Sequence, residues 1–424
     1  MHVNNNEVLN HIKIPLKKDK PTFQAGGFYN ISTKVQENPL LNRGILDLGG
    51  IGIPQAAMSN NKTEAIERGT MSALYFSASF LTPFVMLPFF NKRFLRPTEI
   101  VKNFKSNEIL IMEVPKKYLT KGADYLIEGI RETAKVIKND KLRKTKVDPT
   151  QDFENIIERF KDNKEELYKR LVKVHEKVLK WDFLTTGAMW VATPWGITEG
   201  SKLFTKRDDF SAMHKMKTEE KIDAEKLKKD KLKRFALTTA IATVPAFLVS
   251  KTAMKCITSE SNNIIKKYAN NFNYKYGKFM SKTLFALMWA LADYPASLVS
   301  ARDGYERKDR SIRYGGMVVA FFAIDPLVNN VLGKLSDAVL GTEVMGKRDI
   351  KGLREITEIK NVSKLTKMSA VGIYWAGMIA AIAALGFGLP AFLNAMLKNT
   401  IRKEALAKSP VIPLDKRNFK EFGF

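Results

Sequence analysis

The chain of 424 residues is 45% hydrophobic, so it has enough apolar material for a large buried core or for several membrane-spanning helices. Its 70 Lys and Arg against 44 Asp and Glu give a net charge of +26, which points to an anionic long-range partner: acidic phospholipid, nucleic acid or an acidic protein. The single cysteine, Cys256, excludes an intramolecular disulfide and a zinc site built from cysteines.

Residues 1–45 are polar and predict a disordered leader. The first twenty residues hold no apolar run of the length that a cleavable secretory signal needs, so we expect membrane targeting to depend on an internal segment. The glycines of LDLGGIGIP at 46–54 do not complete a dinucleotide-binding pattern and are followed by Pro54. This stretch therefore predicts a flexible turn.

Residues 46–90 predict a first hydrophobic hairpin or anchor. Within them, residues 69–90 form an uncharged run of 22 residues, which is long enough for a first membrane span. Arg68 precedes the run, and Lys92 and Arg93 follow it, as is typical of the ends of a span.

Residues 91–181 predict a charged helical connector. Its second half carries a helical stripe of apolar residues that we expect to pack on a neighbouring helix, with Asp152 or Thr150 as the cap after Pro149. The stripe is made of Phe153, Ile156, Ile157, Phe160, Leu167, Leu171, Val174 and Val178. The alternatives are a basic helix lying on anionic lipid and a docking helix for a protein partner at residues 150–181.

Residues 182–397 form a hydrophobic helical region with an internal repeat. Residues 235–250 and 285–300 share ten of sixteen residues in register, which predicts a duplicated helical unit. In both copies two alanines lie four apart, Ala236 with Ala240 and Ala286 with Ala290, a spacing that favours close helix packing.

A proline lies well inside every apolar block, and helix-interior prolines predict kinked or broken helices. These prolines are Pro83, Pro194, Pro245, Pro295, Pro326 and Pro390. Two of the blocks also contain an acid, Asp293 or Asp325. Because ionisable groups at membrane depth tend to mark ion or proton paths, Asp293 and Asp325 are the candidate intramembrane site. The alternative is that both acids begin turns or cap broken helices.

The thirty residues 368–397 contain no ionisable group and predict the clearest membrane span. Small residues recur at every fourth position of this span, so one face of the helix would let another helix approach closely. These helix-packing residues are Gly372, Ala376, Ala380, Ala384 and Gly388. The alternative is a buried core helix of a large soluble α-protein. Residues 398–424 predict a basic flexible tail.

No sequence pattern indicates an enzyme, a cofactor or a metal. The chain has no phosphate-binding lysine loop, no His-Glu-x-x-His and no nucleophile elbow, and its four histidines are scattered. If all six apolar blocks crossed, Lys and Arg would be nearly balanced between the two sides, contrary to the positive-inside rule. We therefore expect that fewer blocks cross, that some proline-broken blocks enter and leave on one face, or that the chain is partly a soluble bundle.

The sequence thus predicts an all-α membrane helical bundle with proline-broken helices and charged amphipathic helical connectors, multi-pass or partly re-entrant. The leading hypothesis is a structural or interaction protein that uses its basic segments on anionic lipids or acidic partners. The alternatives are a transporter or channel-like protein with intramembrane acids and a soluble all-α nucleic-acid-binding protein. We expect lipid, rather than nucleic acid, to be the partner. The number of crossings, the orientation and the oligomeric state stay open.

Overall fold

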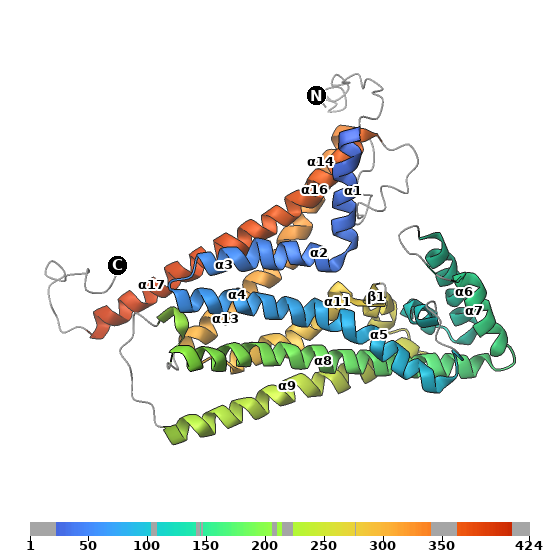
Figure 1. Ribbon diagram of the computed structural model, residues 1–424, viewed down its shortest axis with the longest axis horizontal. Coiled ribbons are helices and arrows are strands. Elements are labelled where there is room, and N and C mark those ends of the chain that lie inside the picture. The colour runs from blue at the N-terminus through green and yellow to red at the C-terminus, as the bar shows by residue number, and fades with distance from the viewer. Residues whose placement is uncertain are drawn as a thin grey trace, which may run out of the picture. The chain divides into compact units, whose positions relative to one another are not determined.

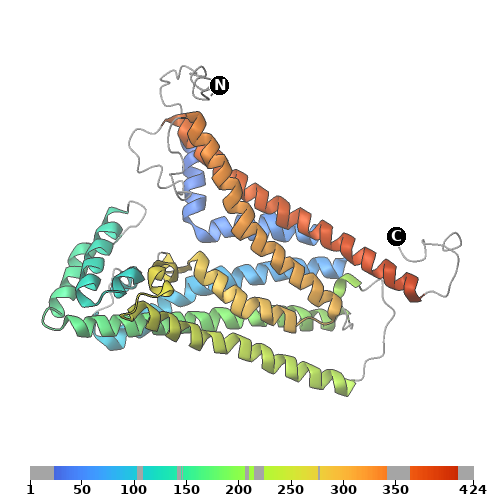
Figure 2. The same ribbon diagram turned by 180° about the vertical axis from the view of Figure 1, so that it is seen from behind.

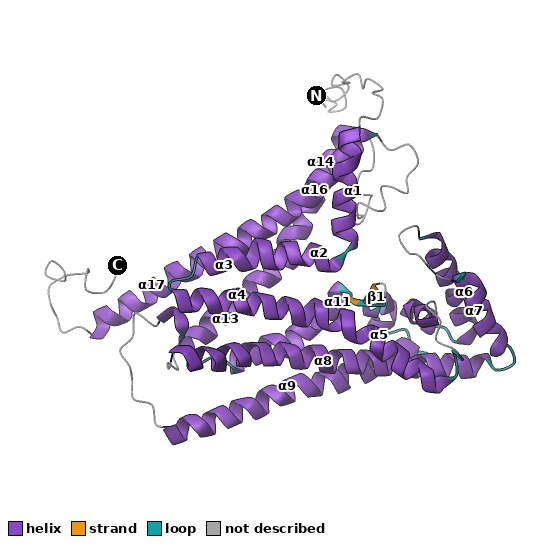
Figure 3. Cartoon of the chain, viewed as in Figure 1, coloured by secondary structure: helices purple, strands orange, loops and turns teal. Residues whose placement is uncertain are grey.

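The computed structural model describes residues 23–408 except 103–107, 141–144, 146, 206–209, 214–223, 276 and 341–362. The described chain is helical almost throughout, and its strands form one short antiparallel hairpin (Figure 3). The all-α prediction is therefore confirmed. Three helical stretches are long and apolar enough to cross a membrane: Lys62–Thr98, Leu232–Thr258 and Lys364–Asn399.

The described α-helices are α1 (Phe23–Glu37), α2 (Pro39–Arg43), α3 (Ile53–Ala57), α4 (Lys62–Phe76), α5 (Thr82–Leu95), α6 (Ala123–Asn139), α7 (Pro149–Arg159), α8 (Lys164–Thr205), α9 (Ala224–Thr258), α10 (Ile264–Lys267), α11 (Lys282–Met288), α12 (Tyr294–Val299), α13 (Gly304–Val319), α14 (Asp325–Leu340), α16 (Lys364–Ile382) and α17 (Leu389–Lys408). The wider π-helical segments are η2 (Gly44–Gly52), η3 (Ser77–Leu81), η9 (Trp289–Asp293), η10 (Ala320–Ile324) and η11 (Ala383–Gly388). The 3₁₀ turns are η4 (Arg96–Thr98), η5 (Glu108–Glu113), η6 (Lys116–Leu119), η7 (Ser211–Met213) and η8 (Ala269–Phe272). Strands β1 (Tyr274–Lys275) and β2 (Phe279–Met280) pair with Tyr274 opposite Met280.

The chain divides into two compact units, residues 1–38 with 324–379 and residues 39–323 with 380–424. In the first unit, Tyr29 of α1 is buried in one cluster with Val371 of α16, and Trp375 Nε1 donates to Ser32 Oγ at 2.9 Å. The prediction of a disordered leader is therefore wrong for residues 23–45, which form α1, α2 and the start of η2. A buried polar bond and a buried aromatic ring hold α1 in place.

The second unit is built around α8, a helix of 42 residues that lies beside α9 along much of its length (Figures 1 and 2). The apolar stripe predicted for the charged connector is buried except for Phe160, which is half-buried. It belongs to two helices, because the chain breaks after α7 and restarts at Lys164. The cap of α7 is Asp148, whose carboxylate accepts from the backbone N of Thr150 at 2.9 Å. Asp152 and Thr150 were the wrong cap residues, because Pro149 already occupies the first turn.

Each of the five π-helical segments ends two residues before a proline. These prolines are Pro54, Pro83, Pro295, Pro326 and Pro390. A proline cannot donate to the preceding turn, and the extra residue of a π segment lets the helix continue around that lost bond. The helix axis thus runs on, and the prediction of broken helices is wrong here. Pro194 and Pro245 lie inside the α-helices α8 and α9, and the flexible turn predicted at 46–54 falls within η2 and the start of α3.

The two copies of the internal repeat bury equivalent positions. Copy one lies within α9, and copy two spans α11, η9 and α12. The shared buried positions are Thr238 and Met288, Ala242 and Ala292, Ala246 and Ala296, and Ser250 and Ser300. A Cβ on Gly187 of α8 would lie 3.5 Å from the Ala242 carbonyl and 3.9 Å from the Ala292 Cβ. Helix α8 therefore packs against both copies at matching points. Ala236 and Ala240, the alanine pair predicted to pack in the first copy, are exposed.

A close backbone approach in the second unit joins η2 to η11 through two glycines. A Cβ on Gly386 would lie 2.4 Å from the Gly50 carbonyl oxygen, and a Cβ on Gly50 would lie 2.4 Å from the Ile382 side chain. Of the small residues predicted to form a packing face, Gly372 and Gly388 are exposed and the three alanines are half-buried. Close packing through that face stays a prediction, whereas Gly386 makes a close contact within the chain.

We expect Gly386→Ala to destabilise the protein by about 1–3 kcal/mol, because the new methyl group would meet a backbone carbonyl that cannot move aside. Gly372→Ala is the matched control, since no atom lies within 4 Å of its added Cβ and alanine favours a helix by up to about 1 kcal/mol. Thermal unfolding followed by tryptophan fluorescence measures both. Equal stability of the two variants would contradict the contact.

Candidate functional site

A cavity of about 180 Å³ lies in the second unit, and its wall comes mainly from α4 and α13, with further residues from α2, η2, α3, η3, η7, α8, α11, η9, α12 and α17. One part of the wall is aromatic, with Tyr75, Phe80, Trp190, Phe285 and Trp289. The other part is charged and is formed where α4 and α13 begin. The cavity therefore offers a small volume with one apolar and one ionic side.

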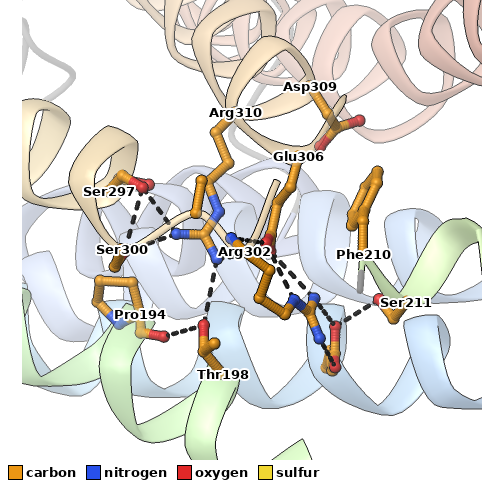
Figure 4. A network of polar contacts seen from close by, with 12 residues as sticks. Pro194, Thr198, Phe210, Ser211, Ser297, Ser300, Arg302, Glu306, Asp309 and Arg310 are labelled. Carbon is orange, nitrogen blue, oxygen red and sulfur yellow. Dashed lines mark hydrogen bonds and ion pairs between the residues drawn. The ribbon is translucent and has the colours of Figure 1, made fainter. Parts of the chain in front are cut away.

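Glu306 in the first turn of α13 lies between two arginines at the charged side (Figure 4). Arg302 Nε and Arg310 Nη2 lie 3.0 Å and 2.6 Å from its carboxylate oxygens. Arg310 also donates to the Ser297 carbonyl and to Ser300 Oγ, each at 2.7 Å. Burial alone would raise the pKa of Glu306, but the two arginines lower it to about 2.

The start of α4 is built in the same way as the start of α13. Asn61 and Asp303 are the caps, and their side chains accept from the backbone N of Glu64 at 3.0 Å and of Glu306 at 2.9 Å. Each glutamate reaches back to the backbone N of the residue before the cap at 2.7 Å. Four residues after each glutamate comes an arginine that pairs with it, Arg68 or Arg310.

Reciprocal ion pairs join these two helix starts. Arg302 binds Glu67 of α4 through both Nη atoms at 2.9 Å, while Arg68 of α4 lies 3.6 Å from Asp309 of α13. Glu67 of α4 thus meets Arg302, which lies two residues before the start of α13, and Asp309 of α13 meets Arg68 of α4. The sequence carries this arrangement as a polar repeat, Asn/Asp-x-x-Glu-x-x-Glu/Asp-Arg, at 61–68 and 303–310, which apolar periodicity does not reveal.

Asp293, one of the two predicted intramembrane acids, lines the cavity and is 4% exposed. Tyr314 donates to its carboxylate at 2.8 Å, and the hydroxyls of Tyr314 and Tyr75 lie 3.1 Å apart. Because the only Tyr314 proton is used on Asp293, Tyr75 is the donor of the second bond. Asp325 is the first residue of α14, and its side chain lies outside the described part of the chain.

Arg313 also lines the cavity and is 8% exposed. Its Nε and Nη2 lie 2.9 Å and 3.3 Å from the two oxygens of Asp309. Its Nη1 is buried and has no hydrogen-bond partner among the described residues. A buried donor without a partner costs about 1–3 kcal/mol, and more when it is charged, so this atom marks an unused binding group.

A second buried polar cluster joins α8 to the strand hairpin and η8. Tyr274 donates to Asp182 at 2.8 Å, and Lys116 Nζ donates to the Phe272 carbonyl at 2.7 Å. Burial lowers the pKa of Lys116 to about 7 and raises the pKa of Asp182 to about 7, and it also lowers the pKa of His175. Lys116 and Asp182 each bind protein groups directly, so this cluster holds the fold together.

Within the described ranges, no three His, Cys, Asp or Glu side chains are grouped so that they could hold a metal ion. No protein-family model, no curated protein and no solved structure matches the chain. The site is therefore interpreted from its own chemistry.

We expect Glu306→Gln to lower the free energy of unfolding by about 3–5 kcal/mol at neutral pH, because it removes the carboxylate paired with buried Arg310 and one of the two paired with Arg302. The folded pKa of Glu306 lies below its unfolded value, so its contribution is present above about pH 4.5 and is lost as the pH falls toward 2. The difference between wild type and variant should therefore shrink over this range in denaturant titrations. Glu158→Gln, at an exposed ion pair, is the control and should change stability by less than about 1 kcal/mol. A pH-independent difference for Glu306→Gln would contradict the assignment.

Proposed function

We propose that this chain is an integral membrane protein of the transporter type, which binds a small solute in the cavity between α4 and α13. The observation that carries this proposal is the placement of the cavity between two helices with matching caps and reciprocal ion pairs. Transporters commonly bind their substrates between internal repeats, at interrupted helices. Here α4 and α13 both continue into a π segment and a proline.

The surface of the second unit supports membrane insertion. Val85 and Phe89 of α5 and Val244 and Leu248 of α9 are all more than half exposed, although they lie in stretches apolar enough to cross a membrane. In contrast, α6 and α7 carry exposed ion pairs such as Arg131–Glu154 and Lys138–Asp148, which favour a water-facing region. The same unit thus has an apolar and a charged surface region.

The spacing of features along α8 fits a bilayer. Trp181 contacts the ring of Phe94, and Lys177 and Lys180 lie over neighbouring aromatic rings, an arrangement typical of a membrane interface. Ser201, twenty positions later, accepts from Arg302 of the ion network at 3.4 Å. Twenty residues of helix span about 30 Å, the thickness of a hydrocarbon core.

The buried acid and its tyrosines give the cavity a polar contact on its apolar side. Asp293 lies at the end of a π segment and its carboxylate is held by Tyr314. Membrane-embedded acids that face a cavity commonly take part in solute or proton binding. We therefore assign Asp293 a part in solute binding within this cavity.

A structural role on anionic lipid is the second candidate, favoured by the lysines beside the aromatic rings. Lys180 Nζ lies 5.0 Å from the Phe247 ring and Lys177 Nζ lies 6.0 Å from the Phe94 ring. Lysines at an interface can bind acidic headgroups while their stems cover apolar surface. This role is compatible with a solute cavity in the same chain.

We expect Val244→Lys to impair membrane integration, because lysine within a membrane span is unfavourable, by up to about 2.5–3.5 kcal/mol at its centre. Val136→Lys on α6 is the matched control and should have no effect, since its side chain, 69% exposed against 51% for Val244, would face water. Carbonate extraction and Triton X-114 partition measure both variants. Wild-type protein that stays in the aqueous phase would refute membrane integration.

We expect Ser72→Cys, at the cavity wall, to react with a small charged methanethiosulfonate in a Cys256→Ser background. Ser250→Cys is the matched control, because Ser250 is buried between packed helices and does not line the cavity. The labelling rate of reconstituted protein is the measurement. Equal rates for both cysteines would show that solutes in water do not reach the cavity, and would overturn the proposed function.

A further inference from the structure

We propose that the cavity binds a small amphiphilic monoanion, a carboxylate on an apolar body about the size of one ring, and that Arg313 is its anchoring residue. This inference deepens the proposed function and rests on it. It assigns a chemical class to the solute and a contact to a residue that otherwise has an unused buried donor.

The Arg313 guanidinium is bound by Asp309 on one side only. Asp309 binds the side of the group formed by Nε and Nη2, at 2.9 Å and 3.3 Å. A guanidinium has five N–H donors in a fixed plane, so the end formed by Nη1 and the outer hydrogen of Nη2 is still free to donate. Two parallel donors at this end match the two oxygens of a carboxylate.

The Arg313 Nη1 atom has no acceptor among the described residues. Nη1 is buried and has no hydrogen-bond partner among the described residues, although Arg313 lines the cavity. Each arginine of the wall has an acid: Arg43 pairs with Asp47, Arg68 with Glu64, Arg310 with Glu306 and Arg313 with Asp309. Among them, Arg313 has a buried nitrogen that is left without an acceptor from the described residues. Arg313 is therefore the arginine whose remaining donors favour an oxygen supplied by a ligand.

The size and the lining of the cavity fit a small apolar body. A cavity of about 150 Å³ is enough to bind benzene, so a cavity of about 180 Å³ has room for one substituted ring. Phe76, Phe80, Met317 and Leu389 line the same cavity and provide apolar contacts. An apolar body would therefore be held by these side chains while its acid reaches Arg313.

The competing interpretation is an organic cation held by Asp293 and the aromatic rings. Asp293 accepts from Tyr314, which in turn accepts from Tyr75, so its carboxylate already has a protein donor. Arg313 has the opposite deficit, a charged donor without an acceptor. The unmet bond in the wall thus favours an anion.

The test uses three probes with the same ring and different heads: benzoate, benzamide and benzylamine. Trp190 and Trp289 line the cavity, so binding to the full-length protein in detergent can be followed by tryptophan fluorescence. We expect benzoate to bind saturably and more tightly than either other probe. Arg313→Gln should weaken benzoate binding on the order of a hundredfold, because it removes the buried charge that pairs with the ligand.

Arg313→Lys keeps a charge beside Asp309 and removes the planar fork, so it should also lose benzoate binding while unfolding at nearly the wild-type temperature. Arg93→Gln, at an exposed arginine, is the control and should bind benzoate as the wild type does.

Equal binding of benzamide and benzoate, tighter binding of benzylamine, or no saturable change with any probe would each overturn the inference. The lysine substitution and thiol-labelling experiments use none of these probes, so the proposed function can stand where this inference fails.

Discussion

The reciprocal ion pairs between α4 and α13 are the constraint on which the cavity depends. Glu67 with Arg302 and Arg68 with Asp309 join two helix starts that lie more than two hundred residues apart in the chain. Charges buried in this way are stable only when each has its partner, so neither helix can shift alone without leaving a charge unpaired. The network thereby fixes the distance between the helices, and the space enclosed beside it is the cavity.

The prolines also affect the cavity wall and the packing of the helices, through the π segments that precede them. A π segment before a proline widens the helix by one residue and changes which side chains face inward. At η9 this places Asp293 in the cavity wall, and at η2 and η11 it accompanies the close contact of Gly50 with Gly386. Local irregularity in the backbone therefore supplies both a polar group for the site and a tight packing point for the fold.

The exposed surface of the second unit has an apolar region and a charged region. The apolar side chains exposed on α5 and α9 and the exposed ion pairs on α6 and α7 belong to one unit, and the aromatic and lysine side chains around Trp181 lie where α8 passes between them. Such a surface is stable when its apolar part is solvated by lipid and its charged part by water. The ion network is then about one bilayer thickness along α8 from these rings.

The sequence by itself determined the helical class, the long apolar stretches and the buried face of residues 153–178, because these follow from composition and from a period of about 3.6 residues. It also singled out Asp293, since an acid in an apolar block is a local anomaly. It could not give the outcome at each proline, because whether a helix breaks or widens depends on the helices packed around it. Only the tertiary structure decided that Glu67 meets Arg302 and that Arg313 keeps an unused donor in a cavity wall. Contacts between distant segments depend on packing in three dimensions, so they cannot be predicted from the periodicity of the sequence.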